Sequence, residues 1–170
     1  MNKVIWVFGP SAVGKETFIK EVAVNHDLKE LIGFGGKKIV VINESILFIK
    51  QSENDPIGDR RIEIIDRVIL ENANNVNTVI LIKGQDIDVE NKLVEKLKEQ
   101  LKDVEYEIFL LVSDINTIFE RGKKKSWFKK EDDDINMWRT HVVESMQMVE
   151  EIKDVKITKI DSTNGWQFLN

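Results

Sequence analysis

Residues 9–17 combine residue types and a spacing that are suited to holding a phosphate group. They read Gly-Pro-Ser-Ala-Val-Gly-Lys-Glu-Thr after a short apolar run and nearly match the pattern G-x-x-x-x-G-K-[ST]. Glycines in such a loop let backbone N–H groups surround an anion, and the lysine brings a charge to the outer phosphates at the start of a helix. The residues predicted to bind a nucleotide here are Gly9, Pro10, Ser11, Ala12, Val13, Gly14, Lys15, Glu16 and Thr17. The simpler alternative is a glycine-containing turn with an incidental lysine.

The loop departs from the pattern at Glu16, where the pattern has a hydroxyl that ligates Mg²⁺. Thr17 stands one position later and is the candidate metal ligand in this segment. A carboxylate beside bound phosphates is unfavourable unless it points outward or helps to hold the metal ion. The sequence leaves both alternatives open for Glu16.

The loop resembles that of the P-loop small-molecule kinases, a group in the P-loop NTPase superfamily that contains nucleoside monophosphate kinases, shikimate kinase and gluconate kinase. In the adenylate kinase version, G-x-x-G-x-G-K-G-T, the threonine also follows the lysine by two positions. The positions that match this version are Gly9, Gly14, Lys15 and Thr17, whereas Ala12 and Glu16 replace two glycines. The resemblance extends over the chain in element order and size. It implies a five-stranded parallel sheet in the order 2-3-1-4-5, ATP with Mg²⁺, and a mobile lid over the phosphates.

A strongly basic segment follows the fourth apolar run, since six of residues 121–130 are Lys or Arg. The resemblance places a lid here, at about residues 121–134, and implies that Arg121 and Lys125 stabilise charge on the transferring phosphoryl group. The two residues are four positions apart and would share a face if the preceding helix continued through them. Two alternatives are a basic turn that neutralises the acidic residues 131–134 and a stacking platform for single-stranded nucleic acid formed by Trp127 and Phe128.

Polar residues follow the other predicted strands, at the sheet edge where ligands of open parallel sheets bind. The residues predicted to contact the phosphate acceptor are Glu44, Arg60, Arg61 and Gln85. Glu44 is also a candidate metal ligand, although it and the two arginines could equally be exposed surface charges. The resemblance further places Asn164 near the adenine.

The third apolar run ends in Lys83, at a position where P-loop enzymes commonly have an aspartate that helps to hold Mg²⁺. A metal ion would then depend on Thr17, Glu44 or Asp86, or mainly on phosphates and water.

Apolar runs alternate with helix-period segments along the whole chain. The predicted strands cover residues 4–8, 39–42, 78–82, 105–112 and 155–160, the last of which is the most polar and suits a sheet edge. Helices are predicted from about residue 15 to 24, around 62–69, 89–101 and 115–119, and from 135 to 152. This alternation predicts βαβ units and therefore a three-layer α/β/α sandwich with a parallel sheet.

Composition limits the class of protein. The chain has 170 residues, 42% of them hydrophobic and 32% charged, with a net charge of −5, and predicts one folded domain over residues 1–170. It lacks cysteine, which excludes disulfides and thiolate metal sites, and no apolar run approaches the roughly 20 residues of a membrane span. The negative net charge argues against binding to nucleic acid or to an anionic membrane. These features favour a cytoplasmic protein, and the oligomeric state stays open.

The motif and the resemblance together predict an ATP-dependent phosphotransferase that acts on a small hydroxyl- or phosphate-bearing acceptor. Two alternatives remain. One is a nucleotide-binding P-loop protein without kinase activity, which Glu16 and Lys83 would favour. The other is a polynucleotide 5′-hydroxyl kinase that uses the basic segment.

Overall fold

The computed structural model describes residues 2–43, 65, 67–72, 75, 77–84, 98–99 and 104–169. Its elements follow one another in the order β1 (Asn2–Phe8), α1 (Lys15–Val24), α2 (His26–Leu31), β2 (Lys38–Ile42), β3 (Thr78–Lys83), β4 (Val104–Val112), α5 (Ile115–Lys123), a 3₁₀ turn (Lys130–Asp132), α6 (Ile135–Glu150), β5 (Lys156–Asp161) and β6 (Gln167–Leu169). Residues 65, 67–72 and 98–99 are also helical, within two of the segments where helices are predicted. Within the described residues, no helix is both long and apolar enough to cross a bilayer.

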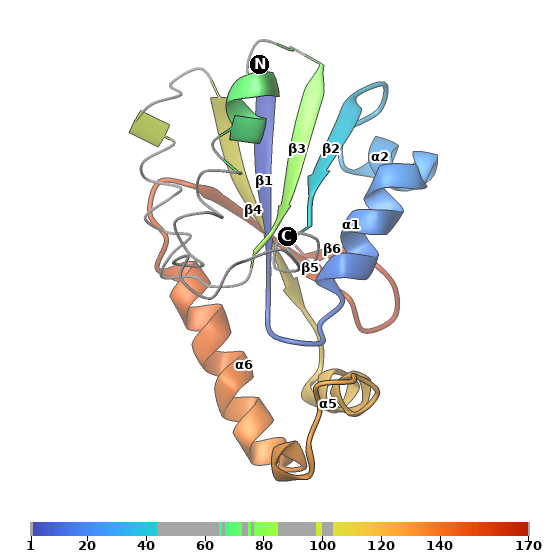
Figure 1. The fold of residues 1–170 in the computed structure, drawn as a ribbon, viewed down its shortest axis with the longest axis vertical. Helices are drawn as coiled ribbons and strands as arrows, with labels where there is room; N and C mark the ends of the chain where they lie inside the picture. Colours follow the sequence, from blue (N-terminus) through green and yellow to red (C-terminus); the bar gives the residue numbers. More distant parts are fainter. Residues whose placement is uncertain are drawn as a thin grey trace, which may run out of the picture.

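The strands form one sheet in the order β2-β3-β1-β4-β5-β6 (Figure 1). The first five are parallel, so the order expected from the resemblance is confirmed. Two expectations were wrong: the sheet has a sixth, antiparallel strand, and β5 is not at the edge, because β6 pairs with it. A strand of three residues is too short to show a period in the sequence.

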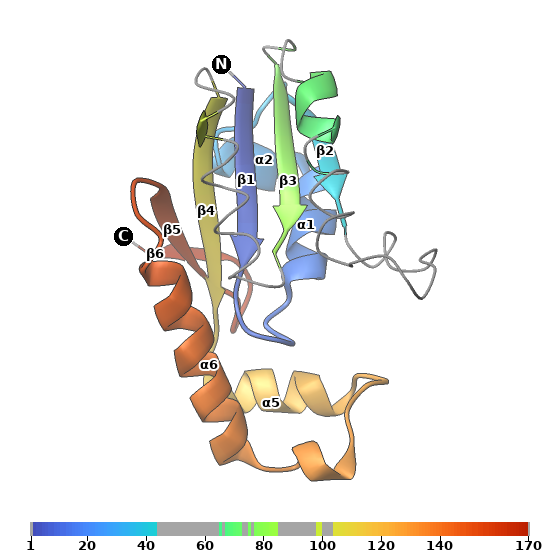
Figure 2. The same ribbon diagram turned by 60° about the vertical axis from the view of Figure 1, so that its left-hand side comes forward.

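The five parallel strands lie within one or two residues of their predicted bounds because most of them are covered on both faces. In β1, every residue from Val4 to Phe8 is at most 1% exposed. Alternate residues of this strand belong to two separate cores: Ile5 and Val7 pack toward α1 and α2, whereas Trp6 and Phe8 pack with Ile65, Ile69 and Val149 on the other face. Helices thus cover both sides of the sheet, as Figure 2 shows, which confirms the three-layer architecture.

The α5–α6 hairpin extends beyond the carboxyl edge of the sheet (Figure 2). Asp114 caps α5, as its position predicts, by accepting a hydrogen bond of 2.9 Å from the backbone N–H of Thr117. Trp138, which is 5% exposed, packs edge-on against Phe119, and its ring centroid lies 6.1 Å from that of Phe128. Aromatic rings thus hold the hairpin together. The sheet edge and this hairpin enclose the candidate site from two directions.

Candidate functional site

The loop between β1 and α1 has the left-handed turns that a phosphate loop requires. Gly9, Ala12 and Gly14 have φ angles of 143°, 63° and 110°. A Cβ on Gly9 would lie 2.5 Å from the carbonyl oxygen of Leu111, so this position has no room for a side chain. Ala12 adopts the left-handed conformation without being glycine, at a cost on the order of 1 kcal/mol. The loop therefore makes the turn despite the substitution.

Lys15 begins α1 and lies across the loop that precedes it. Its Nζ donates hydrogen bonds to the carbonyl oxygens of Gly9 at 2.6 Å and Pro10 at 3.0 Å. Gly14 is the N-cap of α1, and it has no side chain that could accept a hydrogen bond. The first backbone N–H groups of α1 therefore need other hydrogen-bond acceptors. An ammonium group and a helix N-terminus at one place form an environment that favours an anion.

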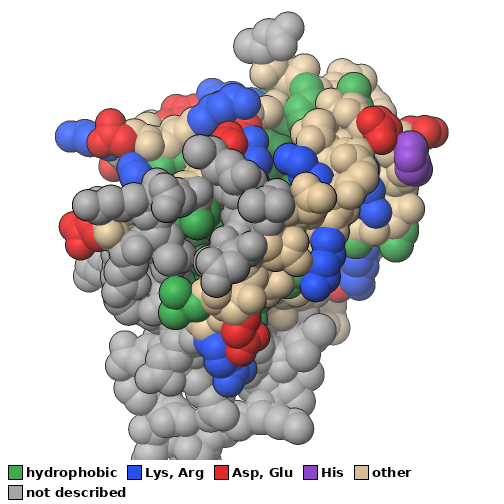
Figure 3. All heavy atoms as spheres, turned by 90° about the horizontal axis from the view of Figure 1, so that it is seen from above, with side chains coloured by type: hydrophobic (Ala, Val, Ile, Leu, Met, Phe, Trp, Pro, Cys, Tyr) green, Lys and Arg blue, Asp and Glu red, His purple; other side chains and the backbone are tan. Residues whose placement is uncertain are grey.

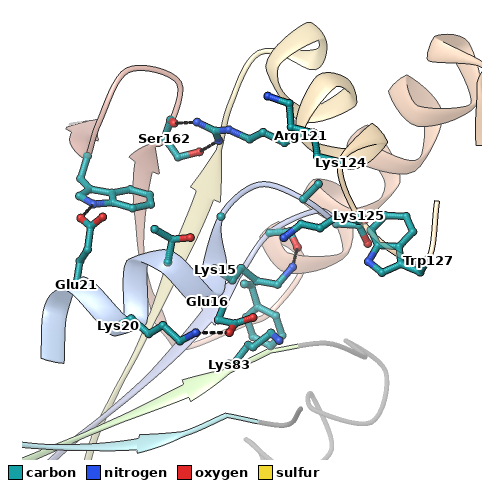
Figure 4. Close-up of a pocket in the computed structure, with 18 of the residues that line it drawn as sticks. Lys15, Glu16, Lys20, Glu21, Lys83, Arg121, Lys124, Lys125, Trp127 and Ser162 are labelled. Carbon is teal, nitrogen blue, oxygen red and sulfur yellow. Dashed lines mark hydrogen bonds and ion pairs between the residues drawn. The ribbon is translucent and has the colours of Figure 1, made fainter.

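A cavity of about 1170 Å³ opens at this loop, at the carboxyl ends of the strands (Figure 4). Its lining contains the predicted residues Gly9, Ser11, Ala12, Gly14, Lys15, Glu16, Thr17, Arg121 and Lys125. Pro10 and Val13 are buried behind the loop, and Asn164 is exposed next to Gly165, which does line the cavity. Among the described residues, six cationic and two acidic side chains contribute to the lining, so this part of the cavity carries an excess of positive charge.

Glu16 pairs with a neighbour on its own helix. Its Oε1 lies 2.6 Å from Nζ of Lys20, one turn further along α1. The hydrogen bond from Lys20 lowers the pKa of Glu16, burial opposes that shift, and the charges of Lys83 and Lys125 lower the pKa further. The sequence leaves open whether Glu16 points outward or helps to hold a metal ion. The pairing with Lys20 favours the outward orientation, along α1.

Arg121 binds backbone carbonyls on two other segments. Its Nη1 donates to Val13 O at 3.1 Å and its Nη2 to Ser162 O at 2.7 Å, while the buried Ser162 Oγ donates to Val13 O at 2.7 Å (Figure 4). We call Val13, Arg121 and Ser162 the Val13 clasp. It joins the phosphate loop to α5 and to the turn after β5. The guanidinium group therefore holds the loop in this structure, and its role toward a transferring phosphoryl group stays a prediction.

Arg121 and Lys125 do not share a helix face, because α5 ends at Lys123. The chain then turns, with hydrogen bonds from Lys124 N to Arg121 O and from Lys125 N to Gly122 O. Lys124 and Lys125 line the cavity from this turn, and Figure 4 shows them on the side opposite α1. The lid assigned to residues 121–134 stays a prediction.

Trp166 was not predicted as a site residue, yet it lies beside the loop. Its ring centroid is 5.0 Å from that of Phe18, and its indole N–H donates to a carboxylate oxygen of Glu21. A Cβ on Gly14 would lie 3.5 Å from the indole, an ordinary van der Waals contact, so the ring borders the start of α1. Trp127, from the stacking platform that the sequence offers as an alternative, also lines the cavity. The other lining residues that the sequence did not single out for binding are Phe8, Lys20, Glu21, Lys83, Lys124, His141, Ser145, Ser162 and Gly165.

Four predicted acceptor contacts, Glu44, Arg60, Arg61 and Gln85, lie outside the described residues, as does Asp86. Their roles stay predictions.

The residues present around the cavity suit phosphate oxygens better than a divalent cation. Thr17 is exposed and contributes a hydroxyl, Glu16 is paired with Lys20, and Lys83 ends β3 with its side chain on the cavity. In the described part of the chain, no group of three or more acidic or histidine side chains could hold a metal ion. Magnesium requires an octahedron of oxygen ligands, and ammonium groups provide none. Among the described positions, Lys83 brings an ammonium group to the end of β3, where an acid would help to hold Mg²⁺, so this part of the lining does not fit the ion.

Neither the protein-family models nor the curated protein sequences contain a match to this chain. Solved structures do resemble it. A protein of Chloroflexus aurantiacus J-10-fl, provisionally assigned as a kinase, has a TM-score of 0.61 and 14% identity, over 96% of this chain and 89% of that one. A structure from the PezAT toxin–antitoxin system of Streptococcus pneumoniae has a TM-score of 0.56 and 16% identity, over 100% and 71% of the two chains. A gluconokinase of Sinorhizobium meliloti 1021 has a TM-score of 0.48 and 14% identity, over 94% and 82%.

These likenesses concern the fold. The loop between β1 and α1, the strand order and the structural neighbours agree that the chain has the fold of the P-loop small-molecule kinases. At identities of 14% and 16%, the neighbours specify no substrate for this chain.

Proposed function

We propose that this protein is an ATP-dependent phosphotransferase that moves the γ-phosphoryl group to a small hydroxyl- or phosphate-bearing acceptor. The observation that carries this proposal is the phosphate loop itself. Left-handed turns at Gly9, Ala12 and Gly14 lead into α1 on the wall of a cationic cavity at the carboxyl ends of the strands. Ligands of open α/β sheets bind at this edge.

In the proposed reaction, the loop amides and the start of α1 bind the phosphates of ATP. Lys15 interacts with oxygens of the β- and γ-phosphates. To do so, its Nζ gives up its hydrogen bonds to the carbonyl oxygens of Gly9 and Pro10 and donates to the phosphates instead. Lys125 approaches the same cavity from the turn after α5 and adds positive charge. The Val13 clasp keeps the loop in place while these groups act.

The chemical step needs alignment and charge stabilisation more than covalent help from the protein. The acceptor oxygen bonds to the γ-phosphorus, the bond from that phosphorus to the β–γ bridging oxygen breaks, and the acceptor proton passes to water. Negative charge spreads over oxygens that Lys15 and Lys125 face, and positioned cations in a partly closed cavity stabilise such charge strongly.

The test is release of ADP by the full chain with a panel of acceptors that contains nucleosides, nucleoside monophosphates, sugars, shikimate-like acids and a 5′-hydroxyl oligonucleotide. Turnover of one small acceptor is expected. Lys15→Ala should reduce the rate by about 10² or more, as loss of one transition-state donor does. Lys153→Ala, an exposed lysine outside the cavity, is the control and should keep the rate. Full activity of Lys15→Ala would exclude the mechanism.

A second candidate is a nucleotide-binding protein without kinase activity. Glu16 and Lys83 favour it, because they occupy positions where Mg²⁺-dependent phosphoryl transfer uses a hydroxyl and an acid. This candidate expects ATP binding that Lys15→Ala weakens, with no turnover of any acceptor in the panel. Oligonucleotide phosphorylation would instead support a polynucleotide kinase.

A further inference from the structure

Lys83 is fixed by the sheet directly beside the phosphate loop. It is the last residue of β3 and pairs in register with Val7 of β1, two positions before Gly9. The next residue, Gly84, donates its N–H to Val7 O at 3.0 Å. Side chains alternate along a strand, so Lys83 projects to the face of Val79 and Leu81, which is the face that α1 covers. Backbone pairing thus directs this ammonium group toward the start of α1.

The side chain of Lys83 lines the cavity together with Lys15 and Glu16 (Figure 4). Its charge is close enough to lower the pKa of Glu16, which places the two groups in the same electrostatic environment. Glu16 pairs with Lys20 at 2.6 Å, so the carboxylate already has a cationic partner. Among the described residues, the cluster at this end of β3 contains three lysines and one carboxylate.

This cluster has the reverse of the charge arrangement that a divalent cation needs. P-loop enzymes hold Mg²⁺ between phosphates, a hydroxyl after the loop lysine and an acid near the end of a neighbouring strand. Here Glu16, engaged with Lys20, directly follows Lys15, and the hydroxyl of Thr17 stands one position later. The ammonium of Lys83 stands where the acid would be. A second positive charge beside Lys15 repels a metal ion but attracts the same phosphate oxygens that the metal would neutralise.

We propose that Lys83 replaces Mg²⁺ as the counter-charge in this site, so that the cavity binds the polyphosphate of a nucleotide in its metal-free form. This inference rests on nucleotide binding at the phosphate loop, but it does not depend on turnover. Lys83 would be the residue that selects the metal-free polyphosphate. The three N–H donors of an ammonium group suit oxygens of adjacent phosphates.

The experiment is calorimetric titration of the full chain with ATP, once in EDTA and once in excess Mg²⁺. The wild type should bind equally well in both buffers or better in EDTA, within a difference of about threefold. Lys83→Asp should bind at least about tenfold more weakly in EDTA and regain affinity when Mg²⁺ is added, because an acid then stands at the end of β3.

Lys124→Asp is the matched control. It makes the same change of charge on the same cavity, from the turn after α5. It should weaken ATP binding in EDTA through the general field, without creating a dependence on Mg²⁺. Lys83→Met is a second variant, in case the aspartate disturbs folding, and should weaken binding in EDTA while its circular dichroism spectrum and Tm match the wild type.

The outcomes separate this inference from the proposed function. Wild-type binding that is tenfold or more tighter with Mg²⁺ than in EDTA would overturn the role of Lys83 and leave the kinase proposal standing. Absence of ATP binding in both buffers would overturn both. Metal-independent binding without turnover would support the inference and exclude the kinase.

Discussion

Two clusters of charged side chains lie toward opposite ends of the sheet, and they differ in balance. Toward the amino ends, Lys3 contacts both Glu105 and Glu107, and Lys156 lies 3.0 Å from Glu107. Thr158 adds a hydrogen bond of 2.6 Å to Glu107. We call these five residues the base cluster. Two lysines balance two carboxylates, so every charge has its partner within the fold.

The described lining of the cavity at the carboxyl ends is unbalanced, with six cationic side chains against two acidic ones. Figure 3 shows the end of the molecule away from the cavity, where positive and negative side chains are mixed over the surface. Balanced charge stabilises a fold locally, whereas an excess of one sign around a cavity implies an external partner of the other sign. Under the proposed function, the comparison therefore predicts that the base cluster serves stability and the cavity residues serve binding.

Replacement of Glu107 should produce the largest effect on stability. This carboxylate is 3% exposed, and Glu107→Gln would leave Lys3, whose side chain is 16% exposed, without its buried counter-charge. Removal of one partner of a buried pair costs about 3–5 kcal/mol, and the exposed Lys156 and the retained amide reduce that to about 2–3 kcal/mol. The free energy of unfolding, measured in urea, should fall by that amount.

The pH dependence of unfolding provides a signature for the same variant. Burial raises the pKa of Glu107, but hydrogen bonds from Lys3, Thr158 and Lys156 outweigh it, so the pKa lies below its ordinary value of 4.5. A depressed carboxyl pKa stabilises the fold above pH 4.5, and that stability is lost as the pH falls through the folded value. Glu107→Gln should lack this part of the acid limb of the stability curve.

Glu105→Gln is the control, because Glu105 is 48% exposed and should cost less than about 1 kcal/mol. Neither substitution should change ATP affinity, since both residues lie outside the cavity lining. If Glu107→Gln bound ATP more weakly while its free energy of unfolding stayed at the wild-type value, the base cluster would contribute to binding, and the two clusters would not have separate roles.

The Val13 clasp should show an intermediate effect that touches both properties. Ser162→Ala removes the hydrogen bond to Val13 O and leaves the one from Arg121. The free energy of unfolding should fall by about 1 kcal/mol, as for a typical buried hydrogen bond. ATP affinity should fall by about threefold to tenfold, because Val13 belongs to the phosphate loop.

Thr158→Ala is the matched variant in the base cluster, since it removes a hydroxyl that donates to Glu107. It should cost a similar amount of stability and leave the ATP affinity unchanged. Equal losses of ATP affinity in both variants would mean that stability alone controls binding.

Local signals in the sequence were sufficient for the loop and for most of the fold. Strands such as β1 are continuous apolar runs because both faces are buried, and α1 begins at Lys15 and ends at Val24 as its pattern predicts. The phosphate loop is contiguous, so its spacing alone reveals it. Helix α2 was not predicted from the sequence, and it begins at His26 because Asn25 ends α1 and accepts a hydrogen bond from Leu28 N.

The rest of the site depends on contacts between distant segments. The direction of Lys83 follows from the register of β3 with β1, and the place of Trp166 follows from a hairpin with a three-residue strand. Arg121 was expected over the phosphates because the resemblance places a lid after the fourth strand, but its contact with Ser162 depends on where α5 ends and β5 turns. The spacing of residues in the sequence predicts neither the register between two strands nor the path of a turn.

The smallest effect is expected at Glu16, the carboxylate nearest the phosphate loop. Glu16→Gln removes an exposed ion pair with Lys20, which costs about 0.3–0.5 kcal/mol of stability. It also removes a negative charge from the cavity and leaves the charge of Lys20 without that partner, so ATP affinity should rise by about twofold to fivefold, more at low salt than at high salt.

Glu30→Gln makes the same change of charge on α2, outside the cavity lining, and should leave the affinity unchanged. A loss of affinity in Glu16→Gln that appears with Mg²⁺ present but not in EDTA would mean that the carboxylate holds a metal ion. The net charge of the cavity with its ligand and metal ion bound would then be closer to zero than the side chains alone indicate. The contrast with the base cluster would have to be drawn with the metal included, and Lys83 could no longer be its substitute.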